Sequence, residues 1–466
     1  MRLYNTLSRS IEKFKPLNPS LVTLYTCGPT VYDYTHLGHM RKYTMDDVLK
    51  RTLIYLGYHV KHVMNITDVG HLTGDDDTGE DKLEKGAKKQ QKTVWEVARF
   101  YTDFFSKTMK ALNITPPDIT CRATDHIPQM IKLIQTLEIN GHTYQTKEAV
   151  YFDVTTFPNY GRLSKQKLTE KLSGVRAEVR VDPQKKHPAD FALWFKSVGR
   201  FKDHSMHWES PWGDGFPGWH IECSAMSMAY LGESIDIHTG GVDHIGVHHE
   251  NEIAQSESAS GKPFVHYWVH HAFLNVKNEK MSKSKDNFFT IEDVQKKGID
   301  PLSLRLLFMQ THYRQEMNFS WKAAKAANDA FRKLQDTRGG LAAEFKNLAT
   351  EAPDQTSVPY KTSFQQALAN DLQTPKAIAT VWEMLKSPLD SAEKLKLLDD
   401  FDQVLGLKLK TTKETEIPKK VLQLAKDRQY AKNNNNFALA DALRKEIESQ
   451  GYKIEDTHGV YKIRKK

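Results

Sequence analysis

The sequence predicts an α/β fold built on an open parallel sheet, because a strand–helix–strand pattern opens the chain. Residues 21–25 read as a short buried strand, 37–56 as a helix that stops at Gly57, and 59–66 as a second strand. The breaker Gly28-Pro29 separates the first strand from the helix. In open sheets, ligands bind beyond the carboxyl ends of the strands and anions bind near helix N-termini. We therefore expect a phosphate site at the start of this helix.

Length and composition indicate a multidomain protein with an anionic partner. A chain of 466 residues is too long for one ordinary core, and a net charge of +8 with a pI near 9.0 favours a polyanion. No apolar run approaches the ~18 residues that span a bilayer, and residues 1–20 lack the apolar core of a signal peptide. The only cysteines, Cys27, Cys121 and Cys223, imply no disulfide framework, so we expect a cytoplasmic location.

A histidine pair marks the start of the first predicted helix, in the string His36-Leu37-Gly38-His39. Side chains three residues apart at a helix start can both face one ligand. A capping or surface role is the alternative for such a pair.

A second string, Lys280-Met281-Ser282-Lys283-Ser284, has polar neighbours that suit a loop. A cation in this loop can neutralise charge that develops on a leaving pyrophosphate, and a solvated surface loop is the alternative. Together and in this order, the two strings resemble the paired signatures of class I aminoacyl-tRNA synthetases. The resemblance implies a Rossmann-like nucleotide-binding sheet with His36, His39, Lys280 and Lys283 as catalytic residues. It also places His36, His39 and Lys283 against ATP.

Three further segments resemble those of cysteinyl-tRNA synthetases. Cys27 follows the first predicted strand, Cys223 lies in segment 218–226, and His248 shares a predicted helix face with Glu252. The resemblance implies that these four residues hold one zinc ion, and thiolates, imidazole and carboxylate all suit zinc. Core thiols and surface polar residues are the alternative.

The same resemblance implies that four residues surround the amino acid and its adenylate: Thr67, Trp219, His220 and Asp243. The implied metal would explain selectivity, because a coordinated thiol loses its proton whereas a serine hydroxyl is a poorer ligand. Pocket fit alone separates small side chains only by about 10- to 200-fold. The neighbouring histidines could suggest a second metal, but we expect most of them to be ordinary hydrogen-bonding residues: His238, His244, His248 and His249.

The resemblance also divides the chain into domains. Residues 1–115 and 190–287 form the split catalytic domain, 116–189 a connective insertion, 288–320 a stem-contact region, 321–407 a helical bundle and 408–466 an anticodon-binding domain. In the last domain, Phe437 could stack on an unpaired base and Asp441 could read a base edge. A solvated basic helix is the alternative there.

The activity implied is that of a cysteine–tRNA ligase, which activates L-cysteine with ATP and transfers it to the terminal ribose of tRNA(Cys). Magnesium is expected with ATP, together with one zinc per chain, no membrane partner and a monomeric state. The closest rival, a ligase that joins cysteine to an amino sugar, lacks the long C-terminal region. A non-catalytic RNA-binding paralogue is the rival of another class. Residues 69–81 are longer and more acidic than the family pattern, so we expect a variable loop there.

Overall fold

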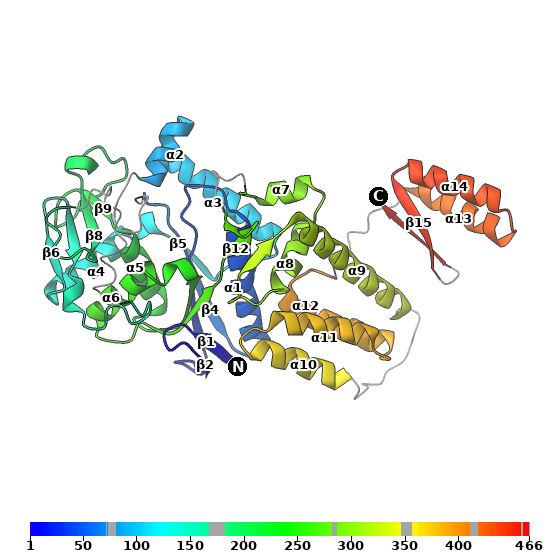
Figure 1. Ribbon diagram of the computed structural model, residues 1–466, viewed down its shortest axis with the longest axis horizontal. Helices are drawn as coiled ribbons and strands as arrows, with labels where there is room; N and C mark the ends of the chain where they lie inside the picture. The colour runs from blue at the N-terminus through cyan, green and yellow to red at the C-terminus, as the bar shows by residue number, and fades with distance from the viewer. Residues whose placement is uncertain are drawn as a thin grey trace. The chain divides into compact units, whose positions relative to one another are not determined.

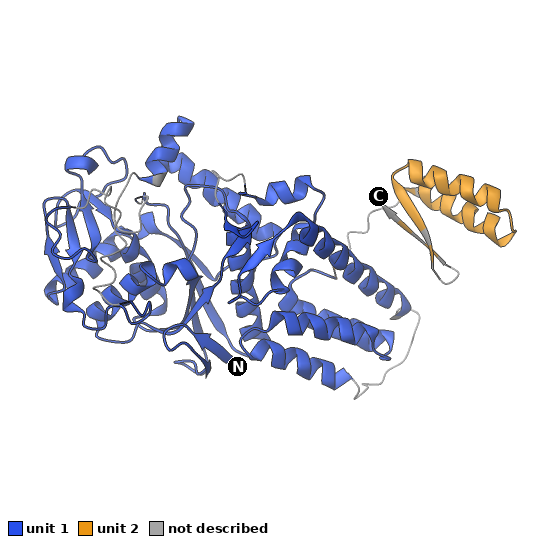
Figure 2. Ribbon diagram, viewed as in Figure 1, with its two compact units in different colours: residues 1–409 blue, residues 410–466 orange. Residues whose placement is uncertain are grey.

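The computed structural model describes residues 1–70, 72, 81–166, 182–281, 287–345, 357–410, 418–457 and 460–465. The chain forms two compact units, Met1–Leu409 and Lys410–Lys466 (Figure 2). No helix within the described ranges is long and apolar enough to cross a membrane.

A five-stranded parallel sheet lies at the centre of the first unit, in the order β11-β10-β3-β4-β5 (Figure 1). Its strands are β3 (Val22–Thr26), β4 (Val60–Ile66), β5 (Ile119–Arg122), β10 (Ile235–Gly241) and β11 (Val265–His271). Neighbouring residues of β3 enter different cores: Leu24 joins the cluster packed against α1 (Leu37–Tyr55), and Tyr25 joins the cluster on the opposite face. Burial on both faces explains why these strands read as nearly continuous apolar runs. The predicted α/β fold is confirmed.

The two sheets of the first unit do not follow the predicted domain boundaries. One strand of the predicted insertion belongs to the parallel sheet, and two strands of the predicted catalytic domain belong to a second, antiparallel sheet. β5 lies inside the predicted 116–189 insertion, yet it pairs in parallel with β4. β8 (Phe191–Lys196) and β9 (Gly215–Pro217), which follow the predicted boundary at 190, pair antiparallel with β6 (Thr143–Gln145) and β7 (Ala149–Phe152). The chain therefore returns to the parallel sheet at β10 and not at the predicted boundary at 190. β8 is buried at five of six positions, so its apolar run looks like a parallel strand.

Helices complete the first unit around the sheet. α3 (Val94–Ala111) follows β4, while α4 (Ile127–Ile139), α5 (Trp219–Leu231) and α6 (His248–Ser260) contribute to the core cluster that contains Tyr25. The bundle predicted at 321–407 contains α9 (Trp321–Phe345), α10 (Val358–Ala369), α11 (Thr374–Lys386) and α12 (Ser391–Leu405).

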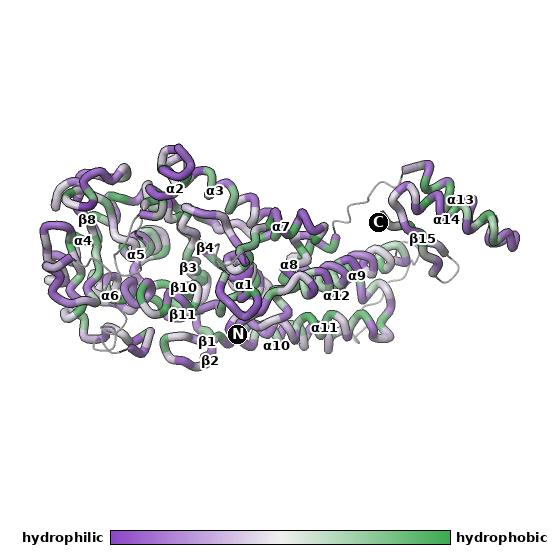
Figure 3. Tube along the Cα trace, turned by 45° about the horizontal axis from the view of Figure 1, so that its top comes forward, coloured by the Kyte–Doolittle hydropathy of each residue, from purple (hydrophilic) through white to green (hydrophobic). Residues whose placement is uncertain are grey.

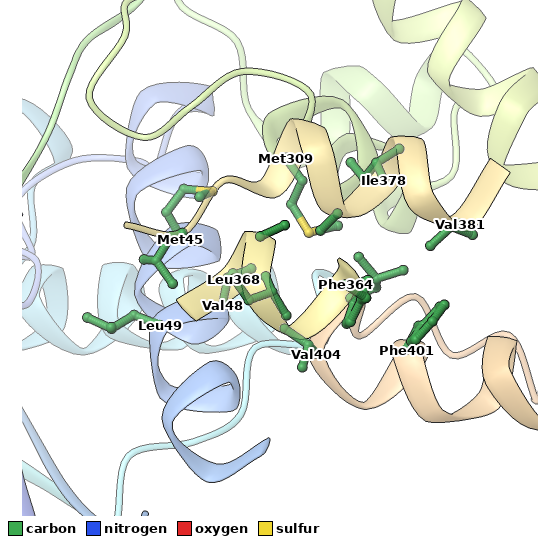
Figure 4. Packing of buried hydrophobic residues seen from close by; sticks show 14 of the residues in the cluster. Met45, Val48, Leu49, Met309, Phe364, Leu368, Ile378, Val381, Phe401 and Val404 are labelled. Atoms are coloured by element: carbon green, nitrogen blue, oxygen red, sulfur yellow. The ribbon is translucent and has the colours of Figure 1, made fainter. Parts of the chain in front are cut away.

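The bundle shares one hydrophobic core with α1. Val48 of α1 and Leu368 of α10 belong to this core, in which Phe364 stacks on Phe401 of α12 (Figure 4). A buried ion pair reinforces the junction, because Arg305 Nη2 in α8 (Pro301–Met309) lies 2.5 Å from Asp47 Oδ2 in α1. Helix α1, which carries the histidine pair at its start, is thus fixed from both sides.

The second unit consists of two helices and a hairpin. α13 (Lys419–Asn433) and α14 (Phe437–Ser449) pack against β15 (Tyr452–Thr457), which pairs antiparallel with β16 (Val460–Lys465). The small core includes Val421, Ala425 and Ile454. The anticodon-binding role predicted for 408–466 stays a prediction.

A buried histidine joins the four-stranded sheet to the start of α2 (Lys82–Gln90). His204 Nε2 lies 3.2 Å from Asp81 Oδ2, and its ring stacks on Phe216 with centroids 3.9 Å apart. Asp81 also caps α2, since its Oδ1 accepts a hydrogen bond from Glu84 N. Burial opposes a charge on His204, but the Asp81 carboxylate outweighs it and raises the pKa of His204.

This raised pKa predicts a pH-dependent contribution to stability. A histidine whose pKa is raised in the folded state stabilises fully below its unfolded pKa of about 6.5, and the contribution disappears as pH rises through the folded value. Replacing His204 with Gln should therefore lower the free energy of unfolding more at pH 5.5 than at pH 8.5, by at least about 0.5 kcal/mol. Denaturant titrations at both pH values measure the difference. His207→Gln is the control, because His207 is exposed and its pair with Asp214 is screened by solvent. Equal losses of unfolding free energy for His204→Gln at both pH values would contradict the prediction.

Candidate active site and metal-binding cluster

A cavity of about 520 Å³ opens at the carboxyl ends of β3 and β10. Eight of the predicted site residues line it: Cys27, His36, His39, Thr67, Trp219, Asp243, His248 and Lys280. The chain order of the strands reverses between β3 and β10, so the cavity occupies the switch point at which open α/β sheets bind ligands.

Hydrogen bonds at the strand ends fix the wall of this cavity. Cys27 N donates a hydrogen bond to Thr239 O of β10 at 3.1 Å, and Gly28 N donates to Asn65 Oδ1 of β4 at 2.7 Å. A Cβ atom on Gly28 would lie 1.6 Å from the Asn65 carbonyl oxygen, so only glycine allows this approach. The Cys27 thiol is thereby held at the junction of three strands.

Two thiols and an imidazole form a compact, buried cluster. The ligand atoms of Cys27, Cys223 and His248 all lie within 4.8 Å of one another, and this group could hold a metal ion. Cys27 Sγ is 3.8 Å from His248 Nε2, and the same nitrogen is 2.9 Å from Glu252 Oε1. The structure thus brings three of the four predicted ligands into one group, with Glu252 joined to it through His248.

The electrostatics of the cluster suit a divalent cation. Glu252 Oε1 is fully buried and accepts no hydrogen bond from any described residue, despite its short distance to His248. A hydrogen bond from Cys223 lowers the pKa of Cys27, while the same contact and burial raise the pKa of Cys223. Burial would lower the pKa of His248, but Glu252 and Cys27 raise it to about 10. A cation would satisfy the orphaned carboxylate oxygen and replace the protons that these groups otherwise share.

Neighbouring side chains orient the predicted ligands. His220 Nδ1 and His248 Nδ1 are 3.0 Å apart, and the Trp219 ring stacks on His248 with centroids 4.2 Å apart. His238 Nε2 lies 2.9 Å from Glu252 Oε2 and fixes the other oxygen of that carboxylate. Such partners hold metal ligands in one orientation.

We expected His238 to be an ordinary hydrogen-bonding residue, but its ring contacts Glu252 of the cluster. The available signal was its place on β10, since alternation along the strand puts it on the face that α6 covers. His249 is also close: it forms candidate groups with Cys27 and His244, and with His238 and Glu252. The four predicted ligands are therefore embedded in a wider set of histidines.

The histidine pair at the start of α1 caps its own helix. Gly38 N donates a hydrogen bond to His36 Nδ1 at 3.1 Å, and the two rings stack with centroids 3.7 Å apart. Burial lowers the pKa of His36 to about 2, and the charges of His39 and Lys280 contribute to the same lowering. Burial also lowers the pKa of His39 to about 4, although Asp243 opposes it. Both rings are neutral near pH 7, and both line the cavity. The capping and ligand-facing interpretations of this pair are thus compatible.

The lysine string begins beside this pair. Lys280 lies on β13 (Glu279–Lys280), and its Nζ is 4.5 Å from the centroid of the Phe273 ring. After the string, His36 forms a backbone bridge with Thr290, and Leu37 N donates to Phe289 O at 3.0 Å. Lys283 falls in residues 282–286, outside the described ranges. The described residues on either side of 282–286 therefore lie near the start of α1.

The predicted substrate residues occupy different positions in the cavity. Thr67 follows β4, and its Oγ1 accepts a hydrogen bond from Asn65 Nδ2 at 3.1 Å. Asp243 follows β10 and is close enough to His39 to affect its pKa. His220 is buried behind the wall, where it contacts His248. Phe437 and Asp441 lie in the second unit, where Phe437 begins α14 with 60% of its surface exposed.

Comparisons with known proteins agree with this geometry. Residues 13–329 match the family model of the class I tRNA synthetase (C) catalytic domain. The chain is 43% identical to a cysteine–tRNA ligase of Treponema denticola, with 98% of each chain covered. It is 41% identical to cysteine–tRNA ligase 1 of Burkholderia lata, covering 98% of this chain and 95% of that one.

The fold also resembles solved synthetase structures. A Mycobacterium tuberculosis methionyl-tRNA synthetase with methionyl-adenylate superimposes with a TM-score of 0.56 at 16% identity, over 83% of this chain and 90% of that one. A leucyl enzyme of Agrobacterium radiobacter, in a ternary complex with tRNA, gives 0.60 at 12% identity, over 85% and 84%. The parallel sheet, the site at its switch point and the nearly full-length relatives lead to one conclusion: the chain belongs to the cysteinyl-tRNA synthetase family of class I aminoacyl-tRNA synthetases.

Proposed function

We propose that this chain is a cysteine–tRNA ligase that uses one zinc ion to select the thiol of its substrate. The observation that carries the proposal is the cluster of Cys27, Cys223 and His248. Two of its members, Cys27 and His248, line the same cavity as His36 and His39. A thiol-binding group and a nucleotide-binding group thus share one cavity. Such a cavity suits the condensation of cysteine with ATP.

In the activation step, the cysteine carboxylate attacks the α-phosphate of ATP, and pyrophosphate leaves. The neutral rings of His36 and His39 can donate hydrogen bonds to the phosphates, and Lys280 and Lys283 neutralise the charge that develops on the leaving group. Magnesium accompanies the nucleotide. Asp243 lines the same cavity and suits the substrate ammonium or a ribose hydroxyl. Catalysis here consists mainly of positioning and charge stabilisation.

Selection of cysteine is proposed to depend on Cys27, Cys223, His248 and Glu252 as the zinc ligands. When bound, the ion would act as a Lewis acid that can coordinate the substrate thiol as a thiolate. A serine hydroxyl is a poorer ligand for the same ion. The residues of the chain hold this site dry and rigid: all four ligands are buried, and His220 orients His248. Thr67 and Trp219 complete the pocket around the amino acid. The three cysteines are free and buried, which supports a reducing cytoplasm as the location.

The first test is cysteine-dependent exchange of pyrophosphate into ATP, followed by charging of tRNA(Cys). Wild-type protein should support both, and serine should support neither. Lys283→Ala should slow exchange by at least about 100-fold, the scale of losing a transition-state donor. Lys296→Ala, which removes an exposed lysine of α7 (Ile291–Lys296), is the matched control. Exchange by Lys283→Ala at the wild-type rate would show that Lys283 lacks this role, and no exchange by wild type would refute the proposed function.

The second unit is proposed to bind the anticodon through Phe437 and Asp441. Phe437 is exposed at the start of α14, and Tyr430 of α13 is 74% exposed, so two aromatic rings are available to unpaired bases. Phe437→Ala should weaken binding of tRNA(Cys) by about fivefold or more, measured by titration, because base stacking is lost. Leu422→Ala on α13 removes an exposed aliphatic side chain and should have little effect. Equal affinities for wild type and Phe437→Ala would rule out stacking by this ring.

A further inference from the structure

A basic and aromatic surface on α2 and α3 is not used by the chemistry above. We call it the α2–α3 surface and define it by six exposed residues: Lys88, Lys89, Lys92, Trp95, Arg99 and Phe100. Trp95 is 46% exposed and Phe100 is 40% exposed, which is unusual for rings of this size in one short segment. Figure 3 shows α2 largely in the hydrophilic colour, next to the more mixed α3.

Lys92 and Arg99 interact electrostatically with Glu96, but no cation of this surface forms a close ion pair within the described part of the chain. Lys88, Lys89, Lys92 and Arg99 form no ion pair within 4 Å with any described carboxylate. The nearby acids have structural tasks: Glu96 accepts hydrogen bonds from Thr93 in the capping box of α3, and Glu84 accepts one from Ser205 N. The cations are therefore available to an anionic ligand.

The α2–α3 surface is continuous with the cavity. Tyr34 lines the cavity, and its ring packs edge-on against Phe100, Tyr101 and Phe104 of α3, with centroids 6.0, 5.1 and 4.8 Å away. Phe100 is thus separated from the cavity by a single ring. Lys92 Nζ lies 5.1 Å from the centroid of Phe100, so a cation stands beside this exposed ring.

We propose that the α2–α3 surface binds the unpaired 3′ end of the tRNA as it enters the cavity, an inference that rests on the proposed function. Exposed aromatic rings interleaved with cations are the arrangement that binds single-stranded nucleic acid, because phosphates pair with the cations and bases stack on the rings. The 3′ end is the part of tRNA that must reach the adenylate, and its bases are free to stack. A membrane surface would instead require a larger apolar area, and an acidic peptide would not need two exposed rings.

The experiment compares two tRNA(Cys) transcripts on the full-length protein, one complete and one lacking its four 3′-terminal nucleotides. Wild type should bind the complete transcript more tightly. The double variant Lys88→Glu/Lys89→Glu and the single variant Trp95→Ala should each lose about tenfold in affinity for the complete transcript and less than twofold for the shortened one. Trp95→Phe, which keeps a stacking ring, should restore most of the affinity. Lys376→Glu/Lys386→Glu, which makes the same charge change on exposed positions of α11, is the control.

Two results would overturn the inference: equal losses for both transcripts in the α2–α3 variants, or a wild type that does not distinguish the transcripts. Cysteine-dependent pyrophosphate exchange, which needs no tRNA, is measured on the same preparations. Normal exchange together with either result refutes only the proposal that the α2–α3 surface binds the 3′ end of the tRNA. Absence of exchange in wild type refutes the proposed function itself. Normal exchange in the variants also shows that they are folded.

Discussion

The parallel pairing of β3 with β10 is the constraint on which the site depends. These strands come from distant parts of the sequence, and their register places Thr26 beside Thr239. The residues that follow them, Cys27 and Asp243, therefore meet at one edge of the sheet. Because β10 leads through Gly241 into α6, the same pairing sets His248 within 3.8 Å of the Cys27 thiol. The cluster is a consequence of sheet topology, which no local sequence motif encodes.

Helix α1 connects the histidine pair at its start to the wall that contains Cys27. Its N-terminus carries the His36–His39 pair, and one turn later Lys42 Nζ donates a hydrogen bond to the Cys27 carbonyl at 2.6 Å while pairing with Asp46. Further along, Asp47 forms the buried pair with Arg305. Removing one partner of such a pair leaves an uncompensated buried charge, so α1 has little freedom to move alone. The groups proposed to bind phosphate and thiol are thus held at a fixed separation by one rigid element.

Much of this arrangement could be predicted from the sequence, because the strand–helix–strand pattern and the order of the motifs are local signals. β3 and α1 lie within a residue of their predicted ranges. The limits of the inserted sheet could not be predicted, since β8 is buried on both faces and lacks the alternation that marks an ordinary antiparallel strand. The contact of His238 with Glu252 was also missed, because it joins a strand and a helix through the fold. Lys283 remains a prediction, and so do the roles of Phe437 and Asp441.

The central claim is that the cluster of Cys27, Cys223, His248 and Glu252 holds a metal that binds the substrate thiol. Replacing that metal with cobalt in the full-length protein gives a direct optical readout, because cobalt accepts the same ligand set and reports each thiolate by an absorption band. The account predicts one metal per chain and a thiolate-to-cobalt band that grows when cysteine is added and does not change with serine. A band that stays constant at saturating cysteine would contradict the account and leave the metal with a structural role.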